Sequence, residues 1–500
     1  MEGGGAAQAH RSRQRRRSAP APMRCAALKG ASPRSRARRR CPIRCRLSPA
    51  PRSKGREATA RALPADGVLV GGVAALALAC AGGFQWELRN CEPAENGSYV
   101  TGKTGSPLSR LYCLGVPPIF LAVPFFARAT FRAEVVTGKV WTFEQRQGIG
   151  LGLNTSVNVR MTLLRLEGGG LFVYNPIAPT RECLELVREV EDEVGERVEC
   201  ILLPTTTFEH KQFLRPFCEA FPRARVLVSP GQYSWPVNGL NAWKAGCARA
   251  EVLSDGDGEG VGGLPPGLEV RILDLPPVGL STTVRFSEVA LYHESSRVLL
   301  VCDAVMRLGP PPPSISRRDL EEWADDRNTA ITGLRLLGLF GVREKWKERR
   351  GSSSNGASTS SPSTLTLGWQ RMAMTSLYFG QADVLSPSAS FEELASRKLV
   401  VPPVLGTLVY GPGGRDEDEV AAAVANWSES VAAWDFRTVI PAHFNVAEAG
   451  SADWRAAFEV WRGEGSRTYP EEDVKCLGDV REFLVRSKII FEPANRPKRS

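Results

Sequence analysis

Histidine is scarce in this chain, with four in 500 residues. A site that needs many imidazoles is therefore excluded, and each histidine position limits the chemistry that the chain can carry. His210 and His443 each follow an apolar segment typical of a strand. Because imidazole is a common metal ligand, these two residues are the first candidates for a metal centre.

Closely spaced cysteine pairs are also missing. The twelve cysteines occur singly, apart from Cys41 and Cys45, and no Cys-x-x-Cys pair occurs. This pattern excludes the disulfide framework of a small secreted domain and a zinc ribbon. Cys200 and Cys302 lie in apolar segments, where a free cysteine is usually a small buried hydrophobe, and this usage favours a reducing compartment.

Acidic residues are nearly absent from the first 60 residues. This stretch has seventeen Lys and Arg against Glu2 and Glu57, a net charge of +15, whereas the whole chain carries +10, so the remainder sums to −5. A basic segment rich in Arg, Ser and Ala predicts a disordered transit peptide over residues 1–60, directed to the chloroplast. The alternative is a basic arm that neutralises nucleic-acid phosphates. No aromatic side chain is present there to stack on bases, so we expect no nucleic-acid partner.

Charge is absent from positions 67–86, which lie in an apolar segment covering residues 61–86. About 20 apolar residues suffice to cross a bilayer, although glycines weaken this segment. It is interpreted as a membrane anchor or a second targeting signal, with a flexible spacer as the weaker alternative. An anchor predicts membrane association, which in a plastid means the thylakoid. Residues 87–140 are predicted to be a partly apolar linker, since prolines interrupt the run at 111–127.

The folded region is predicted to span residues 141–495 and to start with a hairpin and a crossover. Residues 159–166 alternate like a strand, three glycines turn the chain, and residues 171–174 return. A helix with one apolar face then starts near Thr180, and a strand ending at Pro204 follows it. Strand, helix and strand in this order predict a parallel connection.

The second half of the folded region repeats this construction. Residues 289–303 predict another hairpin, and residues 437–440 predict the last strand, with helices before and after it. Two polar, glycine-rich or serine-rich stretches, near 254–267 and 346–366, are predicted to be loop insertions. Together these elements predict an α/β sandwich of two packed sheets covered by helices.

All the candidate ligands follow predicted strands. Glu209 and His210 follow the crossover strand, Asp303 ends the second hairpin, and His443 follows the last strand. Loops at the carboxyl ends of strands in α/β sheets converge on one edge, where ligand sites form. Two imidazoles and two carboxylates suffice for a four-ligand centre that accepts zinc, iron or manganese.

Each of these residues also has a simpler interpretation. His210 and His443 can be surface or cap-adjacent side chains, and Asp303 can cap a turn. Glu209 suits the first turn of a helix, where the helix dipole favours acids. His293 shares its strand phase with apolar neighbours and is predicted to be a half-buried structural histidine.

Three further residues are weaker candidates for a substrate pocket. Gln232 and Trp235 belong to an aromatic turn bounded by prolines, and Arg160 is a cation that can meet an anionic substrate. The simpler interpretations are packing for the turn and a structural ion pair for the arginine.

Five short motifs are distributed over residues 141–493: RMT at 160–162, NPIAPT at 175–180, LPTTTFEHK at 203–211, SPGQ at 229–232 and PAHF at 441–444. Through them the chain resembles the metallo-β-lactamase-like superfamily and, within it, an uncharacterised family, a domain of unknown function, of photosynthetic organisms. The resemblance implies a metallo-β-lactamase-like αββα sandwich, with two mixed sheets covered by helices on their outer faces.

The metal-binding pattern of that superfamily, His-x-His-x-Asp-His, aligns with residues 205–210. Thr205 and Thr207 replace its two leading histidines, and residues 275–280, where a further histidine ligand falls, contain none. By this resemblance the first metal position has lost its imidazoles. The second position keeps its set, with Glu in place of Asp.

The resemblance therefore implies at most one divalent metal, zinc or iron, held by Glu209, His210, Asp303 and His443. Such a centre predicts a mononuclear metal-dependent hydrolase of the plastid that acts on a small ester or thioester-like substrate. A binuclear hydrolase is not expected, because its nucleophile bridges two ions and a lone ion with acidic ligands activates water less strongly. The alternative is a catalytically degenerate protein that keeps the fold as a binding or assembly module.

Overall fold

The computed structural model describes residues 84–85, 87–89, 91–92, 99–101, 106–112, 122–124, 126–149, 155–232, 247, 249–254, 263–277, 285–328, 331–332, 347, 363–378, 383–410, 419–463 and 469–486. The predicted transit peptide, most of the apolar segment at 61–86, Trp235 and the central parts of both predicted insertions lie outside these residues. The chain divides into two units between Ala65 and Asp66, and every described residue belongs to the second unit. None of the helices described in it is long and apolar enough to cross a membrane.

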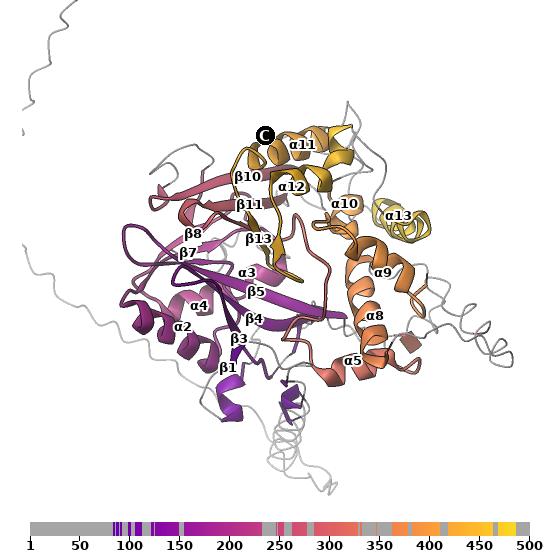
Figure 1. Ribbon diagram of the computed structural model, residues 1–500, viewed down its shortest axis with the longest axis horizontal. Helices are drawn as coiled ribbons and strands as arrows, with labels where there is room; N and C mark the ends of the chain where they lie inside the picture. The colour runs from indigo at the N-terminus through magenta and orange to yellow at the C-terminus, as the bar shows by residue number, and fades with distance from the viewer. Residues whose placement is uncertain are drawn as a thin grey trace, which may run out of the picture. The chain divides into compact units, whose positions relative to one another are not determined.

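Two mixed sheets form the centre of the second unit (Figure 1). Over the described residues the larger sheet has nine strands: β1 (Val100–Thr101), β2 (Ala122–Val123), β3 (Phe131–Val136), β4 (Val140–Ile149), β5 (Thr155–Arg165), β6 (Leu171–Tyr174), β7 (Val198–Leu203), β8 (Arg225–Val228) and β9 (Glu251–Val252). The smaller has five: β10 (Leu268–Pro277), β11 (Arg285–His293), β12 (Val298–Val301), β13 (Thr438–Pro441) and β14 (Ala447–Glu448).

The strand order explains why both sheets are mixed. In the larger sheet the order is β1-β3-β4-β5-β6-β7-β8-β9, with β2 beside β4, and the strands from β6 to β9 are parallel. The smaller sheet follows chain order, and β12 and β13 are its parallel pair. The other neighbours in both sheets are antiparallel.

Helices flank the sheets. The α-helices are α2 (Arg181–Val194), α3 (Phe208–Lys211), α4 (Leu214–Ala220), α5 (Arg317–Ala324), α8 (Thr364–Tyr378), α9 (Ser388–Ala395), α10 (Pro403–Leu408), α11 (Glu419–Val431), α12 (Ser451–Ala457) and α13 (Glu471–Arg486). Short 3-10 helices are η1 (Pro107–Arg110), η4 (Glu294–Ser296) and η6 (Glu459–Arg462).

The alternation of side chains along the strands builds the layers. Successive residues of a strand point to opposite faces, so Leu164 and Leu300 meet in the core between the sheets. Their neighbours point outwards: Leu163 packs with α2 and α4 beneath the larger sheet, and Leu299 packs with α11 and α12 on the smaller one (Figure 1). The predicted αββα sandwich is thus confirmed.

The local predictions for both hairpins are confirmed as well. β5 and β6 pair antiparallel, as do β11 and β12. Thr180 is the N-cap of α2, where its hydroxyl accepts a hydrogen bond from the amide of Cys183 at 3.0 Å, and Gly195 ends the helix with a φ of 72°. β7 then returns parallel to β6, which confirms the crossover.

Three elements differ from the sequence predictions. The sheet also includes β3, which precedes Trp141 and pairs with β4. β13 is not the last strand, because the two-residue β14 pairs with it and is too short to show alternation. The helix whose first turn was predicted to suit Glu209 is divided into α3 and α4, and Glu209 and His210 lie inside the first, short helix.

A helical pair, α5 and α8, packs beside β5 (Figure 1). Trp323 of α5 and Trp369 of α8 are buried in one apolar cluster with Phe444. Gly368 permits the close approach of the helices, because a Cβ at this position would lie 1.9 Å from the carbonyl oxygen of Leu320.

Candidate metal centre

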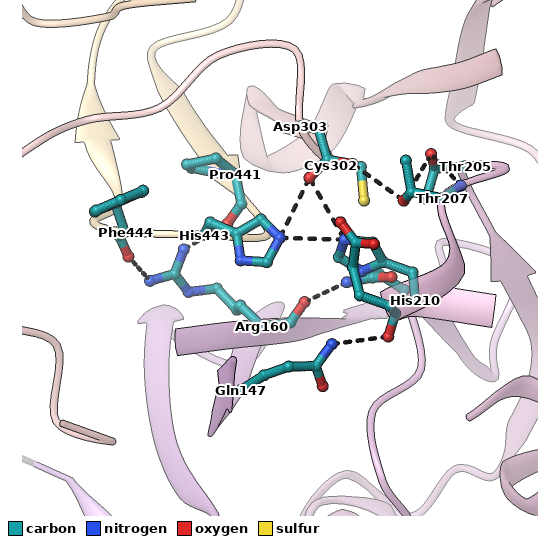
Figure 2. Close-up of polar contacts among 12 residues, drawn as sticks. Gln147, Arg160, Thr205, Thr207, His210, Cys302, Asp303, Pro441, His443 and Phe444 are labelled. Carbon is teal, nitrogen blue, oxygen red and sulfur yellow. Dashed lines mark hydrogen bonds and ion pairs between the residues drawn. The ribbon is translucent and has the colours of Figure 1, made fainter. Parts of the chain in front are cut away.

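Four side chains from three distant parts of the chain meet at the carboxyl ends of strands. Glu209 and His210 lie in α3, which follows β7, while Asp303 follows β12 and His443 follows β13. One potential ligand atom from each of them lies within 4.8 Å of the others. The structure therefore brings together all four residues that the sequence selected as metal ligands. Figure 2 shows three of them, His210, Asp303 and His443.

Three of the four form a tight triangle. Nε2 of His443 lies 3.1 Å from Nε2 of His210 and 3.2 Å from Oδ1 of Asp303, and Nε2 of His210 lies 3.4 Å from the same oxygen. His210 is fully buried, and His443 and Asp303 are largely so. In Figure 2 the two rings and the carboxylate converge on one point.

The triangle has the dimensions of a metal site. A tetrahedral zinc ion with N and O ligands at about 2.0–2.1 Å separates its ligand atoms by roughly 3.3 Å. The three distances observed lie within a few tenths of an ångström of that spacing. Glu209, which is half-buried, supplies a fourth donor within reach. The residues present therefore fit a single divalent cation.

Electrostatics favour a cation at this point. Burial raises the pKa of Asp303, but the charges and hydrogen bonds of His210 and His443 outweigh it and hold that pKa well below its usual range. Burial lowers the pKa of His443, but its hydrogen bond to Asp303 and the charge of that carboxylate outweigh this and raise it. A negative carboxylate thus faces the two imidazoles.

The tautomer of His443 follows from its backbone partner. Nδ1 of His443 lies 2.7 Å from the carbonyl oxygen of Asn158, so Nδ1 carries the proton and donates it there. Nε2 is then left with a lone pair directed at the triangle. A histidine ligand whose other nitrogen is fixed in this way is typical of metal sites.

The side chain of Asn158 fixes the loop that carries His443. Its Oδ1 accepts from the amide of Phe444 at 2.6 Å, and its Nδ2 donates to the carbonyl of Phe444 at 2.9 Å. Phe444 has a φ of 59°, in the left-handed region that side chains seldom adopt. The reciprocal hydrogen bonds hold this conformation and thereby the direction of His443.

Arg160 supports the same loop and does not line a pocket. Its guanidinium is buried, pairs with Glu144 at 2.6 Å and donates to the carbonyl oxygens of Pro441 and Phe444 (Figure 2). These partners occupy the guanidinium within the protein. The interpretation of Arg160 as a substrate contact is therefore replaced by the simpler one, a structural ion pair.

The two threonines that replace the leading histidines of the sequence pattern are linked to Asp303 through their hydroxyl groups. Oγ1 of Thr207 donates to Oδ2 of Asp303 at 3.2 Å and lies 3.2 Å from Oγ1 of Thr205. The second oxygen of Asp303 thus has a protein donor. Gln232 stabilises this segment, because its Nε2 donates to the carbonyl of Thr205 at 2.8 Å.

Sequence reasoning missed one acid beside the centre. Glu288 of β11 is fully buried, and its Oε1 accepts hydrogen bonds from the amides of Cys302, Asp303 and Ala304 at 2.8, 3.1 and 3.0 Å. Burial and then the charge of Asp303 raise the pKa of Glu288 to about 8, although the three amides lower it. A lone acid inside an apolar strand was the signal for it in the sequence.

The prediction that His293 is structural agrees with its surroundings. It is buried, and its two ring nitrogens contact the hydroxyl groups of Ser296 at 2.7 Å and Ser295 at 3.2 Å. Burial, and next the charge of Lys139, lower its pKa to about 4.

The fold and the site together define an αββα sandwich with a cluster of imidazoles and carboxylates at its strand ends. The chain belongs to the family described as Domain of unknown function (DUF4336), whose profile matches residues 137–388 and 385–460. No curated protein sequence matches the chain significantly.

Solved structures with a similar fold include metallo-β-lactamases and flavo di-iron proteins. A metallo-β-lactamase from Hirschia baltica is 11% identical, with 68% of this chain and 99% of that chain covered and a TM-score of 0.33. One from Erythrobacter litoralis is 10% identical over 67% and 96%, with a TM-score of 0.34. A flavo di-iron protein mutant from Thermotoga maritima is 10% identical over 68% and 64%, also with a TM-score of 0.34. A likeness at this level does not indicate an activity.

Proposed function

We propose that this protein binds one divalent cation, zinc or iron, and uses it to hydrolyse a small ester or thioester-like substrate. The observation that carries the proposal is the triangle of His210 Nε2, His443 Nε2 and Asp303 Oδ1, whose edges measure 3.1, 3.2 and 3.4 Å. Glu209 completes the ligand set. When bound, the cation supplies a Lewis acid that polarises an oxygen atom.

The residues of the chain have separate tasks in this proposal. His443 keeps its proton on Nδ1, toward the carbonyl of Asn158, so that Nε2 is free to bind. Thr207 donates to Oδ2 of Asp303 and leaves Oδ1 for the cation. Glu209 has a longer side chain than the aspartate it replaces and still offers the fourth ligand atom within 4.8 Å of the others.

A second candidate is a binding or assembly protein without turnover. The hydroxyl groups of Thr205 and Thr207 favour it, because they stand where binuclear hydrolases hold their first ion. A single cation with two acidic ligands activates water less strongly than two metal ions that share a water molecule. This candidate keeps the cation as a structural or recognition element.

The location is a further part of the proposal. The charge of +15 over residues 1–60 supports import into a plastid, and the uncharged run at 67–86 supports contact with the thylakoid membrane. N-terminal sequencing of the native protein tests both, because a mature terminus beyond residue 86 contradicts an anchor.

Elemental analysis of the full chain tests the metal centre. We expect one equivalent of zinc or iron in the wild type and almost none in His210→Ala or His443→Ala. His293→Gln is the matched control, since this histidine is buried, its ring contacts Ser295 and Ser296, and it is not one of the four candidate ligands. A well-folded, metal-free wild-type protein contradicts the proposal.

Assays with ester and thioester substrates separate the two candidates. Hydrolysis that disappears in the metal-free variants supports the hydrolase. Stoichiometric metal with no turnover of any of these substrates supports the binding protein.

A further inference from the structure

One strand, β11, is joined to two of the three segments that supply ligands. On one side its backbone pairs with the segment before α3: the amide of Thr206 donates to Ser287 at 3.1 Å, and the amide of Val289 donates to Pro204 at 2.8 Å. On the other side the side chain of Glu288 reaches the segment that carries Asp303. β11 therefore lies between the His210 part and the Asp303 part of the centre.

Glu288 makes an unusual contact with this second segment. Three consecutive amides, of residues 302, 303 and 304, converge on one oxygen, Oε1. Successive amides that point at one place form a concave site for an anion. Because one side chain accepts all three hydrogen bonds, it fixes the backbone on both sides of Asp303.

The surroundings make a purely apolar residue the expected choice at this position. The strand neighbours Phe286, Val289 and Ala290 are buried in the two apolar cores that flank β11. Burial of a carboxylate costs several kcal/mol unless hydrogen bonds compensate it. Glu288 is fully buried here, and its Oε1 accepts hydrogen bonds from the three amides of the Asp303 segment. The hydrogen bonds of this acid therefore hold the conformation of the segment that carries Asp303.

We propose that Glu288 is the positioning residue of the metal centre: by fixing the amides around Asp303 it directs that carboxylate at His210 and His443. This inference rests on the proposed metal centre and adds a residue that does not itself bind the cation. A residue that only capped the turn after β12 would affect stability alone. A positioning residue also changes the affinity and the ligand field of the cation.

Titration of the full-length, metal-free protein with Co²⁺ tests the inference, because the visible absorption of Co²⁺ reports its ligand geometry. Glu288→Ala removes the acceptor and leaves three amides unsatisfied. Glu288→Gln keeps an oxygen acceptor and replaces the ionisable carboxyl group with an amide. Tyr174→Phe is the matched control, since its buried hydroxyl donates to the carbonyl of Val289 on the same strand at 2.7 Å instead of to Glu288 or the amides around Asp303.

We expect Glu288→Ala to weaken Co²⁺ binding by about 10- to 100-fold, the usual effect of removing a partner behind a ligand, and to alter the absorption spectrum. Glu288→Gln should weaken binding severalfold while it retains the spectrum. Tyr174→Phe should lower the melting temperature and leave both Co²⁺ readouts unchanged.

Wild-type affinity and spectrum in any folded variant without the carboxylate overturn the inference. If Glu288→Ala does not fold, Glu288→Gln alone decides by the same criterion. A wild-type protein that binds no Co²⁺ overturns the metal centre itself. This result differs from one in which the wild type and the variants bind equally well, which removes only the role of Glu288.

Discussion

His210 and His443 are separated by 233 residues, yet their Nε2 atoms lie 3.1 Å apart and their rings meet edge to face, with centroids 5.0 Å apart. Two imidazole nitrogens at this distance repel each other unless a proton or a cation lies between them. Asp303, within 3.4 Å of both, supplies the negative charge that attracts either one.

Metal binding should stabilise the folded protein and do so through these residues. A ligand that binds only the native state at 100 times its Kd adds about 2.7 kcal/mol to the free energy of unfolding. We expect zinc to raise the melting temperature of the chelator-treated wild type by several degrees and to leave that of His443→Ala unchanged. An equal rise in both proteins, measured by calorimetry, would place the stabilising zinc elsewhere.

Thr207→Val should weaken the cation site without disrupting the fold. The substitution keeps the side-chain volume but removes the hydroxyl that donates to Oδ2 of Asp303. We expect about a 10-fold loss of Co²⁺ affinity. Thr205→Val is the control, because its hydroxyl reaches Asp303 only through Thr207, and a smaller loss is expected. The same affinity in Thr207→Val and wild type argues against this contact.

Arg160→Ala should destabilise the protein by about 3 kcal/mol in urea unfolding, because it leaves Glu144 buried without its partner. The double variant Arg160→Ala/Glu144→Ala should lose less free energy of unfolding than the sum of the losses in the two single variants. The control is Arg181→Ala, which removes an exposed pair with Glu185 on the helix surface and should lower the free energy of unfolding by less than about 0.5 kcal/mol. An Arg160→Ala protein as stable as wild type would contradict the structural role of this ion pair and leave the interpretation of Arg160 as a substrate contact open.

His293 should make stability depend on pH. Its pKa is about 4 in the folded protein and about 6.5 when unfolded, so the unfolded state binds more protons between these values. Its contribution is complete above about pH 6.5 and is lost as the pH falls toward 4, by about 2 to 3 kcal/mol in total. The difference between wild type and His293→Gln in urea unfolding isolates this effect, since His443 titrates in both. A difference that is constant from pH 7 to pH 4.5 contradicts the assignment.

Gly368→Ala should separate α5 from α8. The added Cβ would lie 1.9 Å from the carbonyl oxygen of Leu320, which is backbone and cannot swing away. Overpacking of this kind costs about 3 kcal/mol. Gly478→Ala in α13 is the contrasting change, because its Cβ has open space and alanine favours a helix by up to about 1 kcal/mol. Calorimetry should show a lower melting temperature for the first variant and an equal or higher one for the second.

The hairpins, the crossover and the layers could be predicted because their signals are local. Thr180 caps α2 next to the residues that it caps, and the turn glycines lie between the strands that they join. β14 and the division of α3 from α4 could not be predicted, because a two-residue strand and a helix break have no periodicity of their own. β3 lies in a region read as a linker, and its pairing with β4 is a contact that composition does not show.

The ligands of the candidate centre could be selected because each follows a strand and histidine is rare. The residues that orient them could not. Asn158 acts on Phe444 across 286 residues of sequence, and Glu288 acts on the segment after β12, which only the fold brings beside it. The charge of Arg160 suggested a ligand contact, whereas its partners are carbonyls of the His443 loop.

β11 is bonded through its backbone to the chain before α3 and lies in the sheet that carries Asp303 and His443. A cation held by Glu209, His210, Asp303 and His443 would link the two sheets. Each sheet would then supply part of the coordination of the ion. A change in the spacing of the two sheets would change the ligand geometry, so the metal centre would report how closely the sandwich is packed.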